Sequence, residues 1–147
     1  MDQTVSKKMA TKSIDDVNRV INENLRKNLE NLEVALNKIN EELIEYMQLE
    51  RTLEFMKEHK SDGFKTKIDV GSNMFMKAKV DKIEPILINI GLDVFLELEL
   101  EEALKYLKMK IKVLEKEGDI VRDESLKVRS QIKILLMYLA ERQGLHH

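Results

Sequence analysis

The chain has 147 residues, of which 35% are charged and 5% aromatic, with a formal net charge of −2 and no cysteine. A compact globule of this length usually contains more large apolar side chains, whereas long helices that bury a narrow stripe suit this composition. The charge balance gives no general attraction to nucleic acid or to an anionic membrane, and the lack of cysteine excludes disulfides and thiolate metal sites.

Neither a targeting signal nor a membrane span is predicted. The longest uninterrupted apolar run, Ile134–Ala140, is far shorter than a membrane-spanning helix, and the polar segment 1–13 has no signal-peptide core. We expect a flexible N-terminus over residues 1–13 and a soluble protein of the cell interior. Direct contact with nucleic acid or membrane is not expected.

The first long helix is predicted over residues 14–60, with Ser13 as its N-cap. Its apolar residues alternate at spacings of four and three, the pattern of a helix that meets a partner helix. Two lines result: Leu25, Leu32, Ile39, Tyr46 and Leu53, and beside them Leu29, Leu36 and Leu43. Val17 and Ile21 fit a shifted register, which we interpret as a stutter.

The middle of the chain changes period. The only proline, Pro85, lies there with three of the five glycines, and apolar side chains alternate with polar ones. Four strands are predicted, at Ile68–Val70, Met74–Val80, Ile86–Ile90 and Val94–Leu98. Turn residues divide them into two β-hairpins over residues 66–98.

Two small hairpins are marginal in water, and their open edges call for strands from neighbouring subunits. The hairpins therefore predict oligomerisation. The residues expected to carry it are Ile68, Val70, Met74, Met76, Val80, Ile86, Ile88, Ile90, Phe95, Leu96 and Leu98.

The second long helix is predicted over residues 100–143. One heptad line contains Leu104, Ile111, Gly118, Ser125, Ile132 and Leu139, and the other contains Leu107, Leu114, Val121, Val128 and Leu135. Gly118 and Ser125 indicate either a locally loose seam or a close helix approach. The fold class is therefore mainly α with a small β part: a long antiparallel coiled-coil helical hairpin joined by two β-hairpins, in one domain over residues 14–145.

No catalytic, cofactor-binding or metal site is predicted. The histidines, His59, His146 and His147, are neither in an HExxH spacing nor beside a nucleophile. His146 and His147 could chelate a metal weakly, but we interpret them as a solvated tail. The glycines are too far apart to cradle a phosphate. We therefore expect neither an enzyme nor a bound cofactor.

Apolar side chains also gather where the two free helix ends meet in an antiparallel hairpin. The set is Ile14, Val17, Ile21, Leu135, Leu136, Met137 and Leu139. Leu136 and Met137 fall off both heptad lines. The set is explained either by plain helix packing or by a tip that binds clients or partners.

One segment, Gly91–Leu107, joins the last predicted hairpin to the second helix, and shorter motifs occur at Leu25–Lys27, Gln48–Arg51 and Asp69–Asn73. In this order, with a heptad helix on each side of two hairpins, the sequence resembles α-class subunits of the prefoldin family. Asp93 departs from the family pattern, which often has a second glycine in this turn. Glu99 also departs, since a better N-cap is common there.

The resemblance implies an ATP-independent, heterohexameric co-chaperone in which hairpins build a β-barrel platform and coiled coils project as tentacles that meet clients. It implies β-type prefoldin subunits and a second α-type prefoldin-like subunit as partners. Prefoldin-like members are also linked to the RuvB-like ATPase co-chaperone complex, to transcription factors, and to the cytoplasm, nucleus and centrosome. Two alternatives stay open: a transcriptional co-regulator or adaptor that acts through its helical surface, and a subunit of ordinary prefoldin.

Overall fold

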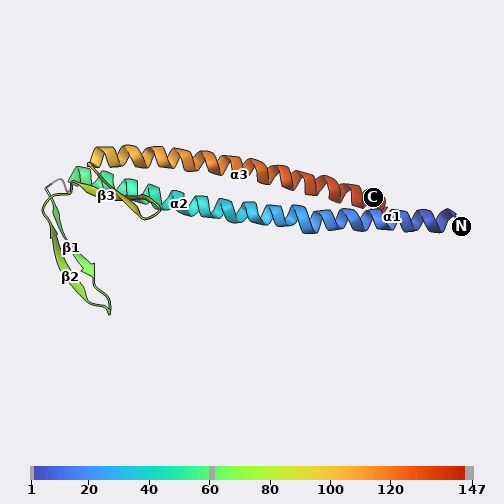
Figure 1. Ribbon diagram of the computed structural model, residues 1–147, viewed down its shortest axis with the longest axis horizontal. Coiled ribbons are helices and arrows are strands. Elements are labelled where there is room, and N and C mark those ends of the chain that lie inside the picture. The colour runs from blue at the N-terminus through green and yellow to red at the C-terminus, as the bar shows by residue number, and fades with distance from the viewer. Residues whose placement is uncertain (1, 60–61, 145–147) are drawn as a thin grey trace. The chain divides into compact units, whose positions relative to one another are not determined.

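The computed structural model describes residues 2–59 and 62–144. In chain order the elements are α1 (Asp2–Arg19), the π-helix η1 (Val20–Leu25), α2 (Arg26–His59), β1 (Phe64–Asp69), β2 (Phe75–Val80), β3 (Ile86–Gly91), β4 (Val94–Leu98) and α3 (Leu100–Arg142). This order confirms the predicted fold class, mainly α with two small hairpins (Figure 1).

The predicted end of the first helix, Lys60, and the predicted end of the domain, Leu145, lie outside the described residues. Over the described residues, no helix combines the length and the hydropathy that a membrane crossing requires.

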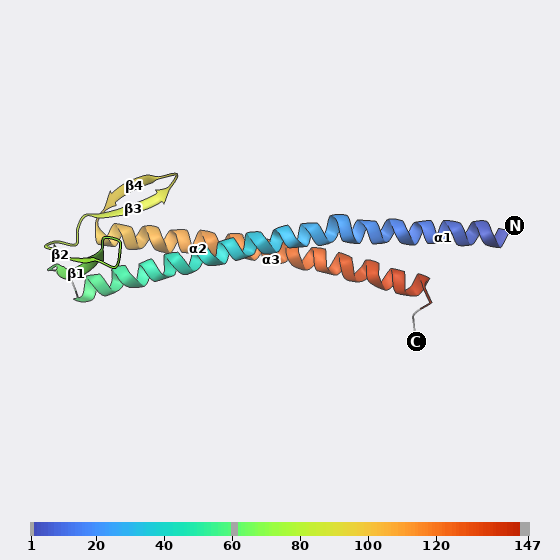
Figure 2. The same cartoon turned by 90° about the horizontal axis from the view of Figure 1, so that it is seen from below.

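The chain forms two compact units. The first combines Met1–Glu41 with Lys116–His147, and the second is Glu42–Glu115. In the first unit the helices run antiparallel: Arg129 Nη2 of α3 lies 3.0 Å from Glu33 Oε1 of α2, while Gly118 lies against Ile39. Within this unit, α1 continues past the end of α3 (Figure 2).

Both predicted heptad lines of α3 face inward, since all their members from Leu104 to Leu139 are buried or half-buried. The two small residues do not reflect a close approach of the helix backbones. A Cβ atom added at Gly118 would lie 3.7 Å from Ile39 Cγ2, an ordinary van der Waals distance. Ser125 Oγ donates a hydrogen bond to the Val121 carbonyl at 2.9 Å, which satisfies this buried hydroxyl. These contacts favour the loose-seam interpretation.

The N-terminal helix starts earlier than predicted. A flexible segment was expected over residues 1–13, but α1 begins at Asp2, and Ser13 lies inside the helix instead of capping it. The segment 2–13 contains neither glycine nor proline, so nothing in its backbone stops a helix. The polar composition that suggested flexibility is compatible with a solvated helix surface, since Lys7, Lys8, Thr11 and Lys12 are all exposed on α1.

A π-helical turn accommodates the predicted stutter. Around η1, four inward-facing residues follow one another at spacings of four: Val17, Ile21, Leu25 and Leu29. An α-helix has 3.6 residues per turn, so this spacing would rotate the apolar stripe away from its partner helix. In η1 the Arg26 N–H donates to the Ile21 carbonyl, five residues back, which widens the turn and keeps the stripe in line.

In the second unit, one hairpin packs on the helices. The core consists of Leu53, Ile88, Leu100, Ala103, Leu104 and Leu107. Ile88 comes from β3, so β3–β4 lies against α2 and the start of α3 (Figure 2). The β1–β2 hairpin forms a separate two-stranded sheet (Figure 1).

Replacing Gly118 with alanine should stabilise the chain. The added methyl group makes ordinary contacts, and alanine is favoured over glycine inside a helix by about 0.8–1 kcal/mol. We expect Gly118→Ala to raise the free energy of unfolding by that amount, measured by urea unfolding followed by circular dichroism.

Gly63→Ala is the matched control. Gly63 has φ 99°, and a Cβ atom there would clash with the Val80 carbonyl oxygen. We expect a loss of about 1–3 kcal/mol from this strain. A destabilising Gly118→Ala would contradict the loose-seam interpretation.

Candidate functional site

The β1–β2 hairpin exposes an apolar face. Strand register places Phe64 opposite Val80, Thr66 opposite Ala78, and Ile68 opposite Met76 on one side of the sheet. Phe64, Ala78 and Val80, nearer the helices in sequence, are half-buried, whereas Ile68 and Met76 are more than half exposed. Val70 and Met74 extend this exposed surface towards the turn. An apolar surface of this kind on a two-stranded sheet is typical of a contact site for other chains.

The β3–β4 hairpin divides its predicted contact residues between core and surface. Ile88 is only 4% exposed and lies in the chain's own core, so its assignment to oligomerisation is corrected. The reason is that α2 and α3 cover the inner face of β3. Ile86 and Leu98 are half-buried beside it, while Ile90, Phe95 and Leu96 are exposed. Leu87, which was not predicted, is also exposed on the outer face, opposite Glu97.

The two hairpins end in turns built on the same plan. Asp69 Oδ1 accepts a hydrogen bond from the Gly71 N–H at 2.8 Å, and Asn89 Oδ1 accepts one from the Gly91 N–H at 2.9 Å. In each turn a glycine with positive φ is followed by two left-handed residues: Ser72 and Asn73 in the first, Leu92 and Asp93 in the second. Aspartate tolerates this conformation, so Asp93 can occupy a turn position at which the resembled family often has glycine.

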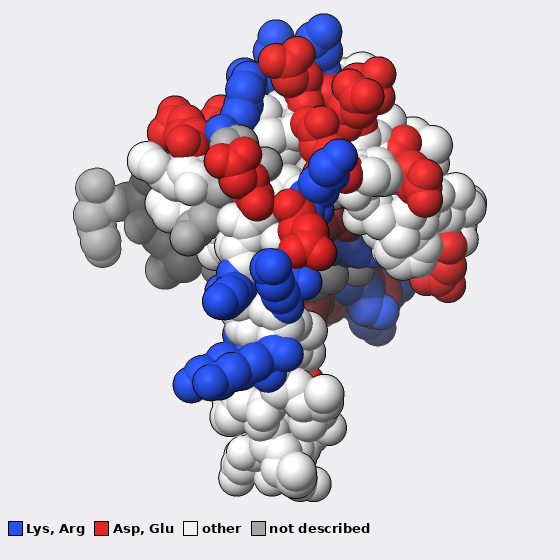
Figure 3. Space-filling view, turned by 90° about the vertical axis from the view of Figure 1, so that its left-hand side faces the viewer, with Lys and Arg blue, Asp and Glu red and all other residues white. Residues whose placement is uncertain are grey.

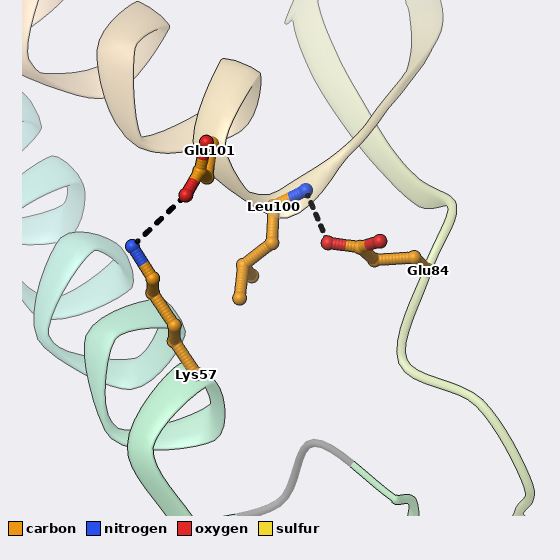
Figure 4. Close-up of polar contacts among 4 residues, drawn as sticks. All are labelled: Lys57, Glu84, Leu100 and Glu101. Atoms are coloured by element: carbon orange, nitrogen blue, oxygen red, sulfur yellow. Dashed lines mark hydrogen bonds and ion pairs between the residues drawn. The ribbon is translucent and has the colours of Figure 1, made fainter.

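Glu84 links the connection between the hairpins to the start of α3. Its Oε1 accepts a hydrogen bond from the Leu100 N–H at 3.0 Å, one of the free donors at the helix N-terminus (Figure 4). Nearby, Lys57 Nζ of α2 lies 3.4 Å from Glu101 Oε1. Glu84 therefore supplies the cap that the sequence lacks at Glu99. The residue was missed because a cap is normally sought next to the helix that it stabilises.

The free helix ends contain both packing and surface residues. Ile21 and Leu139 are buried between the helices, and Ile14, Val17 and Leu135 are half-buried. Leu136 and Met137, which lie off the heptad lines, are exposed. A shallow groove at these helix ends is lined by Met9, Lys12, Ser13, Asp16, Val17, Val20 and Leu135. Met9 was missed because residues 1–13 were expected to be flexible.

The described residues contain no group of three or more histidines, aspartates or glutamates placed to hold a metal ion. His146 and His147 lie outside the part of the chain that the structure describes. The arrangement found in that part is one of apolar and charged surfaces, which suits protein–protein contact.

Known proteins resemble the chain in sequence and in fold. A family model described as "Prefoldin subunit" matches residues 25–145. Protein UXT of Homo sapiens is 31% identical over 131 residues, which cover 89% of this chain and 81% of that protein. Prefoldin subunit alpha of Methanococcus vannielii is 29% identical over 119 residues, covering 76% of this chain and 81% of that protein. The fold of filamentous PFD from Methanocaldococcus jannaschii superposes with a TM-score of 0.66 at 23% identity, covering 84% of this chain and 98% of that one.

Removing the Glu84 cap should destabilise the chain. Glu84→Ala leaves the Leu100 N–H without its acceptor, and loss of a helix cap costs about 0.5–2 kcal/mol. Urea unfolding followed by circular dichroism measures the change. Glu97→Ala, which removes an exposed carboxylate from β4, is the control, and an equal loss in both variants would show that Glu84 has no capping role.

Proposed function

This chain belongs to the prefoldin subunit family, and we propose that it acts as an α-type subunit of a prefoldin-like, heterohexameric, ATP-independent co-chaperone. The resemblance to this family found in the sequence is confirmed, and curated relatives named Protein UXT are among its matches. The α-type assignment is supported by the presence of two hairpins and by the similarity to Prefoldin subunit alpha. In this role the chain binds and positions other proteins and catalyses no reaction.

The exposed apolar face of β1–β2 carries this proposal. A two-stranded sheet is marginal in water, and this one leaves Ile68 and Met76 largely exposed together with its edges. Strands from other subunits would cover the face and pair with the edges at the same time. The hairpin therefore supports assembly into a β-sheet platform with β-type prefoldin subunits and a second α-type subunit.

The helix ends support client contact. Leu136 and Met137 of α3 are exposed, and Met9 and Val20 help to line a separate shallow groove. Apolar side chains on an exposed helix surface are suited to unfolded segments, and methionine adapts to many shapes. In the proposed complex this surface binds clients while the hairpins hold the subunits together.

We extend the proposal to the wider partners that the sequence implied. The RuvB-like ATPase co-chaperone complex and transcription factors would be bound in the cytoplasm and nucleus, and also at the centrosome. Affinity capture of the tagged chain from its native lysate, followed by mass spectrometry, tests this. Recovery of β-type prefoldins with RuvB-like ATPases supports the proposal. Recovery of β-type prefoldins together with the folding partners of tubulin or actin indicates ordinary prefoldin. Recovery of transcription factors without any prefoldin subunit indicates an adaptor that acts outside such a complex.

Charging the apolar face should prevent assembly. Ile68→Asp with Met76→Asp removes two side chains that are each worth about 1.5–3 kcal/mol when buried, so we expect β-type subunits to bind at least about 100-fold more weakly. Capture of purified β-type subunits on the immobilised chain measures this. The matched control is Leu136→Asp with Met137→Asp, which places the same two charges at the helix ends, and unchanged capture by the Ile68→Asp, Met76→Asp variant would refute assembly through β1–β2.

Charging the helix ends should affect clients alone. Leu136→Asp with Met137→Asp replaces exposed apolar contacts, so the assembled complex should lose most of its ability to suppress aggregation of a chemically denatured model protein, measured by light scattering. Assembly should persist, as checked by size-exclusion chromatography. If this variant still suppressed aggregation fully, helix packing alone would explain the apolar residues at the helix ends.

A further inference from the structure

The second face of the β1–β2 hairpin is strongly basic. Strand register places Lys65 directly opposite Lys79, and Lys67 directly opposite Lys77. All four lysines are exposed, and they line a shallow hollow together with Thr66 and Ala78, the residues between them in each strand. We call the four lysines, Lys65, Lys67, Lys77 and Lys79, the lysine face. Figure 3 shows Lys and Arg side chains gathered on the hairpin at the bottom of the view, above an uncharged tip.

The lysine face is electrostatically unfavourable in the isolated chain. Residues directly opposite in an antiparallel pair have Cβ atoms about 4.5–5.5 Å apart, and like charges at this separation destabilise the pairing. Among the described residues, the only ion pair of the lysine face joins Lys79 Nζ to Asp81 Oδ1 at 3.2 Å. Two opposed lysine pairs therefore lie on a sheet that already has few stabilising contacts. A bound anionic partner would convert this repulsion into attraction.

We propose that the lysine face docks a short, extended acidic segment of a partner protein. In an extended chain, side chains two residues apart point to the same side and lie about 6.6–6.8 Å apart. The same distance separates Lys65 from Lys67, and Lys77 from Lys79, along their strands. A segment with carboxylates at alternate positions therefore matches the lysines of either strand.

The ends of the lysine face favour a short segment over a continuous polyanion. Asp69 follows Lys67 on the same face of β1, and Asp81 lies at the other end, beside Lys79. A nucleic acid strand that ran beyond the lysines would bring its phosphates over these carboxylates. The chain as a whole has a net charge of −2 and adds no general attraction for phosphates.

The docking of an acidic segment is independent of the proposed assembly. The lysines lie on the opposite side of β1–β2 from Ile68 and Met76, because neighbouring residues in a strand point to opposite faces. The lysine face is therefore open in the free chain and stays open when the apolar face is covered.

Fluorescence anisotropy at low salt tests the proposal, with the full chain and a labelled peptide of alternating glutamate and threonine. Replacing all four lysines by glutamine should weaken binding at least about tenfold, since each exposed ion pair contributes modestly. The matched control removes the same charge from α3, by changing Lys105, Lys108, Lys112 and Lys116 to glutamine, and should bind like the unchanged chain. Absence of peptide binding, or equal weakening by both variants, overturns the proposal. So does tighter, lysine-dependent binding of oligothymidine.

A single charge reversal separates binding from stability. Lys67→Glu places a carboxylate opposite Lys77, so the hairpin gains a favourable cross-strand pair while the lysine face loses charge. We expect an unchanged or higher thermal unfolding midpoint together with weaker peptide binding. Unchanged or tighter peptide binding would overturn the proposal. A lowered midpoint together with weaker binding would show that Lys67 acts structurally and would also overturn it.

Discussion

The packing of β3 against the two long helices is the contact on which the hairpin region depends. Ile88 enters a core with Leu53 of α2 and Leu104 of α3, where Ala103 and Leu107 are fully buried. This core fixes the start of α3, and the Glu84 carboxylate completes it by capping the helix. Among the described residues, the β1–β2 hairpin contributes no side chain to this core. In the part of the chain that the structure describes, β1 and β2 pair only with each other, so their stability depends on what binds them.

The two hairpins therefore have different roles despite their common turn plan. β3–β4 uses its inner face within the chain and leaves Phe95 and Leu87 outside. β1–β2 keeps both faces open, one apolar around Ile68 and the other basic around Lys67. A sheet with two chemically distinct faces can contact two kinds of partner at once. Assembly and recognition of an acidic segment can thus share one hairpin without competing.

Periodicity predicted what depends on local burial, and it did not predict contacts between distant residues. The heptad lines of α3 and the last three strands follow from spacing alone, because the side chains that repeat at 3.5 or 2 residues are the ones that face a neighbour. The first strand was predicted at Ile68–Val70, whereas β1 spans Phe64–Asp69. The same alternation could not show that Ile88 is covered by helices while Ile68 is not, because the covering elements are far away in sequence. The capping role of Glu84 was not predicted for the same reason, because its partner Leu100 lies 16 residues further along the chain. The opposed lysines became visible only once strand register was known.

The π-helical turn at Val20–Leu25 compensates for the shift in heptad register between α1 and α2. Each residue advances an α-helix by about 100°, so one uncompensated residue would turn Ile14 and Val17 to the side of the helix pair. With the wide turn in place, Ile14 and Val17 stay half-buried, as Leu29 does beyond the turn. A helix can in this way tolerate a single-residue insertion and still present one continuous apolar line. Sequence repeats that seem out of step on either side of residues 20–25 thus belong to one uninterrupted interface.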